Sequence, residues 1–294
     1  MLRGEKAVPQ WDRKPAMSAL TFEYEITPAL AEDQAWRHDI LPALGSVAEN
    51  VTDIWQYCFT EIFNNAIDHS GGRKISVWLA KDATGTRIIV SDDGVGIFRK
   101  IQAALNLLDE RHAILELSKG KLTTDPDNHS GQGIFFSSRL LDSFVILSGG
   151  ACFSHQSPRE NDWMTDVAKP EQGTVVDMRL ENTATRTCKE VFDQYSSGDD
   201  YGFTKTVVPV SLAQYGQDKL VSRSQAKRVL ARVELFKTVV FDFSGVETIG
   251  QAFADEIFRV FARSHPEIET FAAHANSEIR RVIASTLASP NVHY

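Results

Sequence analysis

One stretch of regular spacing limits the folds that this chain can adopt. Apolar residues recur at every fourth position at Ile54, Cys58, Ile62 and Ala66, the spacing of a helix face that packs on a core. Beside them, Glu61, Asn65 and His69 fall on successive turns of an adjoining face. A polar row next to so much apolar surface costs free energy unless its groups are satisfied. The row therefore indicates either a solvated helix face or one wall of a polar site.

A second motif follows a predicted β-hairpin over residues 74–91, in which KISVWLAK and TRIIVS form the two strands. The hairpin runs into SDDGVGI (91–97), which places Asp92 at the end of a strand and Gly94 and Gly96 in a tight corner. Glycine lets the backbone approach a flat ligand closely, and a carboxylate accepts a hydrogen bond from an amine such as that of adenine. An ordinary Asp-Gly turn is the alternative explanation.

A third motif lies in HSGQGIFFSSRLLD (129–142), where Gly131 and Gly133 precede a predicted helix. The segment before this helix, residues 122–133, has the composition of a mobile loop. Backbone amides in the first turn of a helix bind anions, so the motif suits a phosphate group. A glycine-rich helix start without a ligand is also compatible with this motif taken alone.

The order and spacing of the three motifs resemble the GHKL ATPase superfamily over about residues 20–182. Its Bergerat fold is shared by type II topoisomerases, mismatch-repair ATPases, histidine kinases and anti-sigma-factor serine kinases. EIFNNAIDH (61–69) is similar to the N box, DDGVG (92–96) to the G1 box and SGQG (130–133) to the G2 box. GTVV, which begins at Gly173, resembles the late strand that closes the pocket. The resemblance implies an α+β domain, a Bergerat-fold ATP-binding sandwich.

The same resemblance implies ATP and Mg²⁺ as cofactors and assigns roles by position. Asn65 matches the residue that holds Mg²⁺ through its side-chain oxygen, and Glu61 matches the acid that activates a water or hydroxyl nucleophile. Asp92 matches the adenine-binding aspartate, which Thr174 assists through water. The glycines that shape the base pocket or form the hinge of the phosphate-covering lid are Gly94, Gly96, Gly131 and Gly133. The residue types agree, because Mg²⁺ prefers hard oxygen ligands and a carboxylate can accept a nucleophile's proton.

Two features of the lid region depart from well-known relatives. The stretch LSKGKLTTDPDNHSG has no clear counterpart in those relatives. Its Lys119 and Lys121 are candidates for contact with the γ-phosphate. The alternative is that both are solvated, as lysines in polar loops usually are. Phe135 occupies the position of a third glycine that many histidine kinases carry in the G2 box.

Composition changes along the chain predict more than one domain. The predicted divisions are a flexible leader (1–19), a GHKL-like domain (20–182), a polar linker (183–202) and a second domain (203–294). Strands alternate with helices in the second domain, the pattern of a small α/β layer structure. Residues 201–294 hold 11 Lys and Arg against 9 Asp and Glu, a net charge of +2. Because the whole chain has a net charge of −8, residues 1–200 carry a net charge of −10.

Within the second domain, VVFDFSGVETIGQAFADEIF (239–258) is similar to the core of STAS domains. Asp242, Ser244 and Val246 match the D-x-S-x-V turn of that family. Ala252 stands where STAS partners of anti-sigma-factor kinases carry a phosphoacceptor serine. The resemblance therefore implies a STAS-like domain that cannot be phosphorylated by the usual route. An unrelated α/β module with a D-x-S turn is the alternative.

Overall composition narrows the class of protein. A net charge of −8 argues against a general polyanion binder, and no apolar run has the length of a membrane-spanning helix. Three scattered cysteines predict neither a disulfide framework nor a zinc site, and fit reduced thiols in the cytoplasm. The leader is too short to hold the phosphoacceptor hairpin of a histidine kinase.

These observations predict an ATP- and Mg²⁺-dependent signalling protein with slow ATPase or serine/threonine kinase activity. A nucleotide-gated interaction switch without turnover is the alternative, favoured by Ala252. Expected partners are ATP or ADP and the chain's own STAS-like domain, in cis or within a homodimer, or another regulatory protein. A DNA-directed role rests only on Arg223, Lys227, Arg228 and Arg232 of one predicted helix, a cluster that also fits a solvated face or a contact with the acidic domain.

Overall fold

The computed structural model describes residues 19–123, 131–157, 161–196, 202–214 and 219–288. The predicted leader, apart from Ala19, and residues 129 and 130 of the third motif lie outside the described residues. In the first domain, five strands form one antiparallel sheet in the order β1-β2-β3-β5-β4. They are β1 Ala19–Glu25, β2 Lys74–Lys81, β3 Gly85–Asp92, β4 Ser143–Gln156 and β5 Asn161–Glu181.

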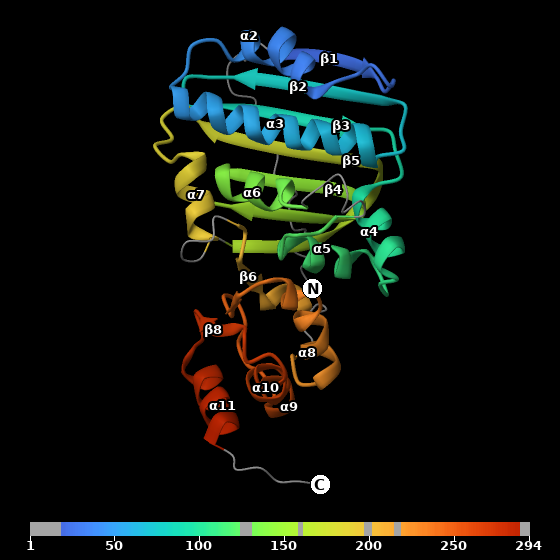
Figure 1. The fold of residues 1–294 in the computed structure, drawn as a ribbon. Helices are drawn as coiled ribbons and strands as arrows, with labels where there is room; N and C mark the ends of the chain where they lie inside the picture. The colour runs from blue at the N-terminus through green and yellow to red at the C-terminus, as the bar shows by residue number, and fades with distance from the viewer. Residues whose placement is uncertain (1–18, 124–130, 158–160, 197–201, 215–218, 289–294) are drawn as a thin grey trace, which may run out of the picture.

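Helices of the first domain lie across one face of this sheet (Figure 1). They are α1 Glu32–Ala35, η1 Trp36–Ile40, α2 Leu41–Leu44, α3 Glu49–His69, α4 Ile97–Leu105, α5 Glu110–Ser118, α6 Gly133–Leu140 and α7 Cys188–Gln194. The alternation predicted for β2 is confirmed, because Ile75, Val77 and Leu79 are all buried. Phe59 and Phe63 of α3 are fully buried in the same core, with ring centroids 5.2 Å apart. Burial of these alternating side chains and of one helix face holds the two layers together.

Two helical runs of the first domain end or divide at residues with positive φ. The first run continues from η1 through Pro42 in α2 and ends at Gly45 with φ of 61°. The second is divided between α4 and α5 at Asn106, whose φ is 51°. A new helix then begins after Asp109, whose side chain accepts a hydrogen bond from the backbone N–H of His112.

The polar segment predicted as a linker is partly folded onto the first domain. Thr187 and Glu190 form a capping box that starts α7. Phe192 of this helix packs edge-on against Tyr57 and Phe136, at centroid distances of 5.2 and 4.6 Å. The chain therefore remains packed on α3 and α6 before it enters the second domain.

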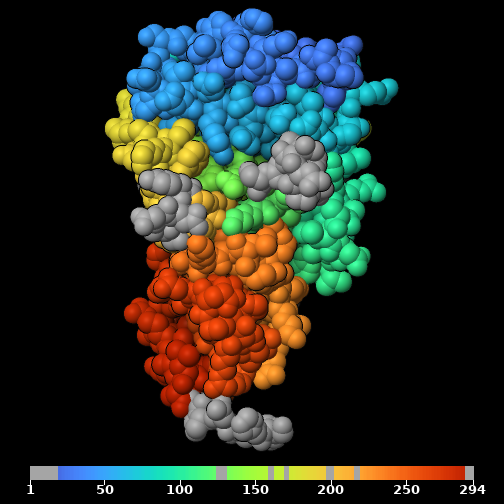
Figure 2. Space-filling view, viewed as in Figure 1, coloured from blue at the N-terminus to red at the C-terminus, as the bar shows by residue number. Residues whose placement is uncertain are grey.

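The second domain contains a parallel sheet in the order β6-β7-β8, formed by Lys205–Pro209, Thr238–Asp242 and Glu269–Ala273. Its helical segments are η2 Val210–Ala213, α8 Arg223–Leu230, η3 Val233–Leu235, α9 Gln251–Asp255, η4 Glu256–Phe261, α10 Ala262–Ser264 and α11 Ser277–Ala288. The predicted alternation of strands and helices is confirmed. Figure 2 shows this domain, coloured orange to red, in direct contact with the green segments of the first. Among the described helices, none is long and apolar enough to span a membrane.

The packing of α3 predicts a specific loss of stability. Phe59→Ala should destabilise the first domain by about 3–5 kcal/mol, because it removes a buried ring and leaves a cavity beneath the sheet. Urea denaturation of the variant is the measurement, with Gln56→Ala on the exposed side of the same helix as the control. Equal denaturation midpoints for the two variants would contradict this account of the core.

Candidate functional site

A cavity of about 350 Å³ lies among α3, α4, the end of β3, the interior of β5 and the start of α6. It brings together predicted site residues that are far apart in the sequence: Glu61, Asn65, Asp92, Gly131, Gly133 and Thr174. The cavity also has apolar walls, which include Ile97, Ile101 and Val176. An apolar cavity with a few convergent polar groups has the character of a small-molecule site.

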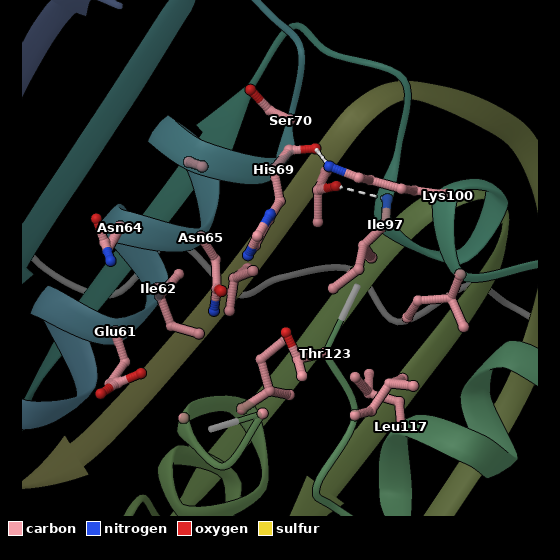
Figure 3. A pocket seen from close by; sticks show the side chains of 18 of the residues that line it. Glu61, Ile62, Asn64, Asn65, His69, Ser70, Ile97, Lys100, Leu117 and Thr123 are labelled. Carbon is pink, nitrogen blue, oxygen red and sulfur yellow. Dashed lines mark hydrogen bonds between the residues drawn. The ribbon is translucent and has the colours of Figure 1, made fainter. Parts of the chain in front are cut away.

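The polar row of α3 forms one wall of the cavity. Figure 3 shows Glu61, Asn65 and His69 on successive turns of the helix along the opening. All three are partly buried, so the row is not a fully solvated face. The Asn65 amide makes no hydrogen bond with any described residue, which leaves its oxygen available to a ligand or metal ion.

Glu61 lies against the first residue of α6. A Cβ at Gly133 would overlap the Glu61 carboxylate, so glycine at this position lets the two helices approach. The α6 N-terminus, where backbone N–H groups point out of the helix, thereby lies close to the wall that carries Glu61 and Asn65.

Asp92 is held at the end of β3 by backbone groups from two segments. Its Oδ1 accepts hydrogen bonds from the N–H of Gly94 at 2.9 Å and from the N–H of Thr174 at 3.3 Å. Burial raises the pKa of Asp92, although these two donors act in the opposite direction. The Thr174 side chain is a third hydrogen-bonding neighbour of this carboxylate, which lines the cavity.

Glycine is required where the backbone turns beneath Asp92. A Cβ at Gly94 would overlap the carbonyl oxygen of Ser70, which follows α3. Gly173 of β5 has φ of 73°, and a Cβ there would overlap the carbonyl of Asp92. The corner therefore fixes the end of α3 against the end of β3 and the interior of β5.

Thr174 reaches a third element from the same corner. Its hydroxyl oxygen accepts a hydrogen bond of 3.0 Å from the N–H of Ile97, the first residue of α4. Its side chain also hydrogen-bonds with the Asp92 carboxylate, so Thr174 connects β5 with both β3 and α4 at the cavity.

The two lysines considered for the γ-phosphate are directed elsewhere in this structure. The Lys119 amine donates to the carbonyls of Arg228 at 3.1 Å and Ala231 at 2.7 Å. The Lys121 amine donates to the carbonyl of Leu235 at 2.7 Å. Neither lysine belongs to the described lining of the cavity. The expected phosphate contact is therefore not formed here, because carbonyls of the second domain bind both ammonium groups.

Lys100 of α4 is a cavity residue that the sequence prediction missed. Its amine donates a 2.7 Å hydrogen bond to the carbonyl of His69, near the end of α3 (Figure 3). Burial lowers the pKa of Lys100, while Asp68 acts in the opposite direction. The only sequence signal was a lysine one turn after Gly96, which by itself is indistinguishable from a solvated surface residue.

The donor set of the cavity fits Mg²⁺ under one condition. The described residues contain no group of three or more His, Cys, Asp or Glu side chains that would form a closed metal site. Mg²⁺ usually retains several waters and binds substrate phosphates together with one or two protein oxygens. The Asn65 amide oxygen suffices as the protein ligand when phosphates and water complete the shell.

The D-x-S turn of the second domain has a local structural role. Asp242 Oδ1 accepts hydrogen bonds from the backbone N–H and the hydroxyl of Ser244, at 2.9 and 2.8 Å. The same oxygen lies 2.8 Å from Nδ1 of His274. Ala252 lies exposed in the first turn of α9. The turn is therefore formed, and the position matched to the phosphoacceptor carries a methyl group.

Comparisons with known families give two matches, one on each side of the polar segment. Residues 50–184 match the family described as histidine kinase-, DNA gyrase B-, and HSP90-like ATPase. Residues 225–275 match a STAS-like domain of unknown function. A search of curated proteins found no match. Both resemblances drawn from the sequence are confirmed.

The close packing at the Asp92 corner predicts that a methyl group added there lowers stability, whereas one added at an open glycine does not. Gly94→Ala should lower stability by about 1–3 kcal/mol, because the new Cβ overlaps the Ser70 carbonyl and forces the backbone apart. Gly150→Ala is the matched control, since a Cβ there has nothing within 4 Å. Thermal unfolding compares the two, and a Gly94→Ala protein as stable as the Gly150→Ala protein would contradict the close approach.

Proposed function

A GHKL-type ATPase domain at residues 50–184 is followed by a STAS-like domain at 225–275, and from this pair we propose an ATP- and Mg²⁺-dependent signalling protein. Its proposed activity is slow ATP hydrolysis or phosphorylation of a protein serine or threonine. The observation that carries the proposal is the meeting of Glu61, Asn65 and Asp92 in one cavity.

Each residue of this set has a distinct task in the proposal. The Asp92 carboxylate accepts a hydrogen bond from the adenine amine, and partial burial strengthens that bond. The Asn65 amide oxygen holds Mg²⁺, which neutralises phosphate charge when bound. Lys100 adds a partly buried cation to the same cavity.

Glu61 is the proposed general base. It accepts the proton of a water or hydroxyl as that oxygen bonds to the γ-phosphorus, while the bond from the γ-phosphorus to the bridging oxygen breaks and ADP leaves. Its place against the N-terminus of α6 supports this role, because backbone donors there can stabilise charge on the transferring group.

A second candidate function is a nucleotide-gated switch without turnover. The absence of a hydroxyl at Ala252 favours it, since the attached STAS-like domain offers no acceptor at the matched position. The fate of the terminal phosphate separates this function from the first.

A nucleic-acid partner is not favoured, because cations of α8 and of the turn after it contact acidic groups within the protein. Arg223 pairs with Asp255 at 3.0 Å, and Lys227 lies 3.9 Å from Glu256. Arg232 pairs with Glu116 of the first domain at 3.3 Å. We place the protein in the cytoplasm, since Cys58, Cys152 and Cys188 are all unpaired thiols.

Asn65→Ala and Asn65→Asp should abolish Mg²⁺-dependent nucleotide binding, because the first removes the metal ligand and the second alters its charge. Isothermal titration calorimetry with ADP in the presence of Mg²⁺ is the measurement, with a chelator-treated wild-type sample as the control. If Asn65→Ala binds ADP in the presence of Mg²⁺ with the wild-type affinity, Asn65 is not the Mg²⁺ ligand.

Acidification should weaken nucleotide binding through Asp92. Only the ionised carboxylate accepts the adenine hydrogen bond, and burial raises its pKa, so affinity should fall at a higher pH than an ordinary aspartate would cause. ADP titrations from neutral pH downward measure this dependence. Asp92→Asn should bind weakly throughout without that inflection, and an inflection shared by the variant would assign it to another group.

A further inference from the structure

A buried polar cluster joins the two domains next to the cavity. Lys119, at 0% exposure, donates to Glu116 Oε1 at 2.7 Å and to two carbonyls at the end of α8. These carbonyls lie at the negative end of the helix, where a cation is stabilised. Burial lowers the pKa of Lys119, and the charge of Glu116 raises it. A buried ammonium is costly without partners, so the STAS-like domain supplies what this lysine needs.

The contact includes the three consecutive residues 119–121. Arg232 donates to Glu116 Oε2 at 3.3 Å and to the carbonyl of Lys121. The Lys121 amine in turn donates to Leu235 and lies 4.7 Å from the centroid of the Phe236 ring. The STAS-like domain therefore binds both the backbone and the side chains of this segment.

The segment continues directly into the wall of the cavity. Leu122 and Thr123 line the cavity, and the N–H of Leu122 donates to the carbonyl of Gly131 at 3.1 Å. Gly131, Gln132 and Gly133 line the same side. We refer to residues 122, 123 and 131–133 as the cavity wall. Lys121 is therefore the residue directly before the cavity wall, and the Leu122–Gly131 hydrogen bond connects the two parts of that wall.

Aromatic packing provides a second connection between the cavity and the STAS-like domain. Phe135 lines the cavity and packs against Phe203 at a centroid distance of 4.6 Å. Phe203 packs against Phe236 of the STAS-like domain at 5.1 Å. Gly120, with φ of 80°, fits between these rings, since a Cβ there would overlap Phe203. Phe135 thus has a structural reason to replace the third glycine of the G2 box.

We propose that the STAS-like domain regulates the nucleotide site by holding the cavity wall in its binding conformation. The inference rests on the proposed function and specifies how that site is controlled. A wall held in place before binding reduces the ordering cost of binding, so docking of α8 strengthens nucleotide affinity. Thermodynamic linkage requires that nucleotide strengthen docking by the same factor. A ligand or protein that pulls the STAS-like domain away would therefore release nucleotide.

Two arginines of one helical region provide a matched test. Arg232→Gln removes the bonds to Glu116 and Lys121 without touching the cavity, while Arg223→Gln removes contacts with Asp255 and Glu256, both within the STAS-like domain. Calorimetry of the full chain with Mg²⁺ and ADP should show affinity reduced at least about fivefold in Arg232→Gln, within the usual range of coupling between sites, and unchanged in Arg223→Gln. Equal affinities in wild type and Arg232→Gln would overturn the inference while leaving the proposed function intact.

A second variant and a second readout keep the test decisive. If Arg232→Gln does not fold, Lys121→Met removes the bond to Leu235 but retains an apolar stem over the aromatic rings, and should weaken binding in the same direction. Hydrogen exchange of amides in residues 225–236 should slow when ADP binds the wild-type chain. ADP binding without this protection would reject the coupling, whereas a wild-type chain that binds no nucleotide would reject the proposed function itself and the inference with it.

Discussion

The arrangement of this protein depends on the backbone corner that holds the Asp92 carboxylate. The carboxylate accepts hydrogen bonds from the N–H groups of Gly94 and Thr174, which joins the end of β3 to the interior of β5. The same corner contacts the end of α3, where the N–H of Val95 donates to the carbonyl of Ser70 at 2.9 Å. Residues without a Cβ make these approaches possible, so this corner positions the Asp92 carboxylate relative to the polar row of α3.

A different constraint governs the junction of the domains, where charged groups are removed from water. Lys119, Glu116 and Arg232 satisfy one another and the carbonyls at the end of α8. The acidic first domain and the slightly basic second domain meet here through specific pairs rather than through net charge. A buried cluster of this kind contributes specificity of docking more than stability, because desolvation offsets much of the attraction.

Local spacing was sufficient to predict some of these features and insufficient for others. The α3 row and the Asp92 corner follow from short motifs in which neighbouring residues determine the geometry. Lys119 could not be placed, since its partners lie more than 100 residues later, at Arg228 and Ala231. Thr187 and Glu190 did carry a readable capping signal for α7, which the polar composition around them obscured. The full extent of β4 could not be predicted either, because Gly149 and Gly150 interrupt the strand pattern where the pairing with β5 shifts register.

The central claim is that the cavity transfers the terminal phosphate of ATP with Glu61 as the base. The most direct test incubates the wild-type chain and Glu61→Gln, which keeps the size of the side chain facing Gly133, with γ-labelled ATP and Mg²⁺. The account predicts that wild type moves the label to free phosphate or to a protein hydroxyl, and that the variant binds ATP but leaves the label in place. Label that stays on ATP in a wild-type protein shown to bind it, or equal rates in both proteins, would contradict the claim.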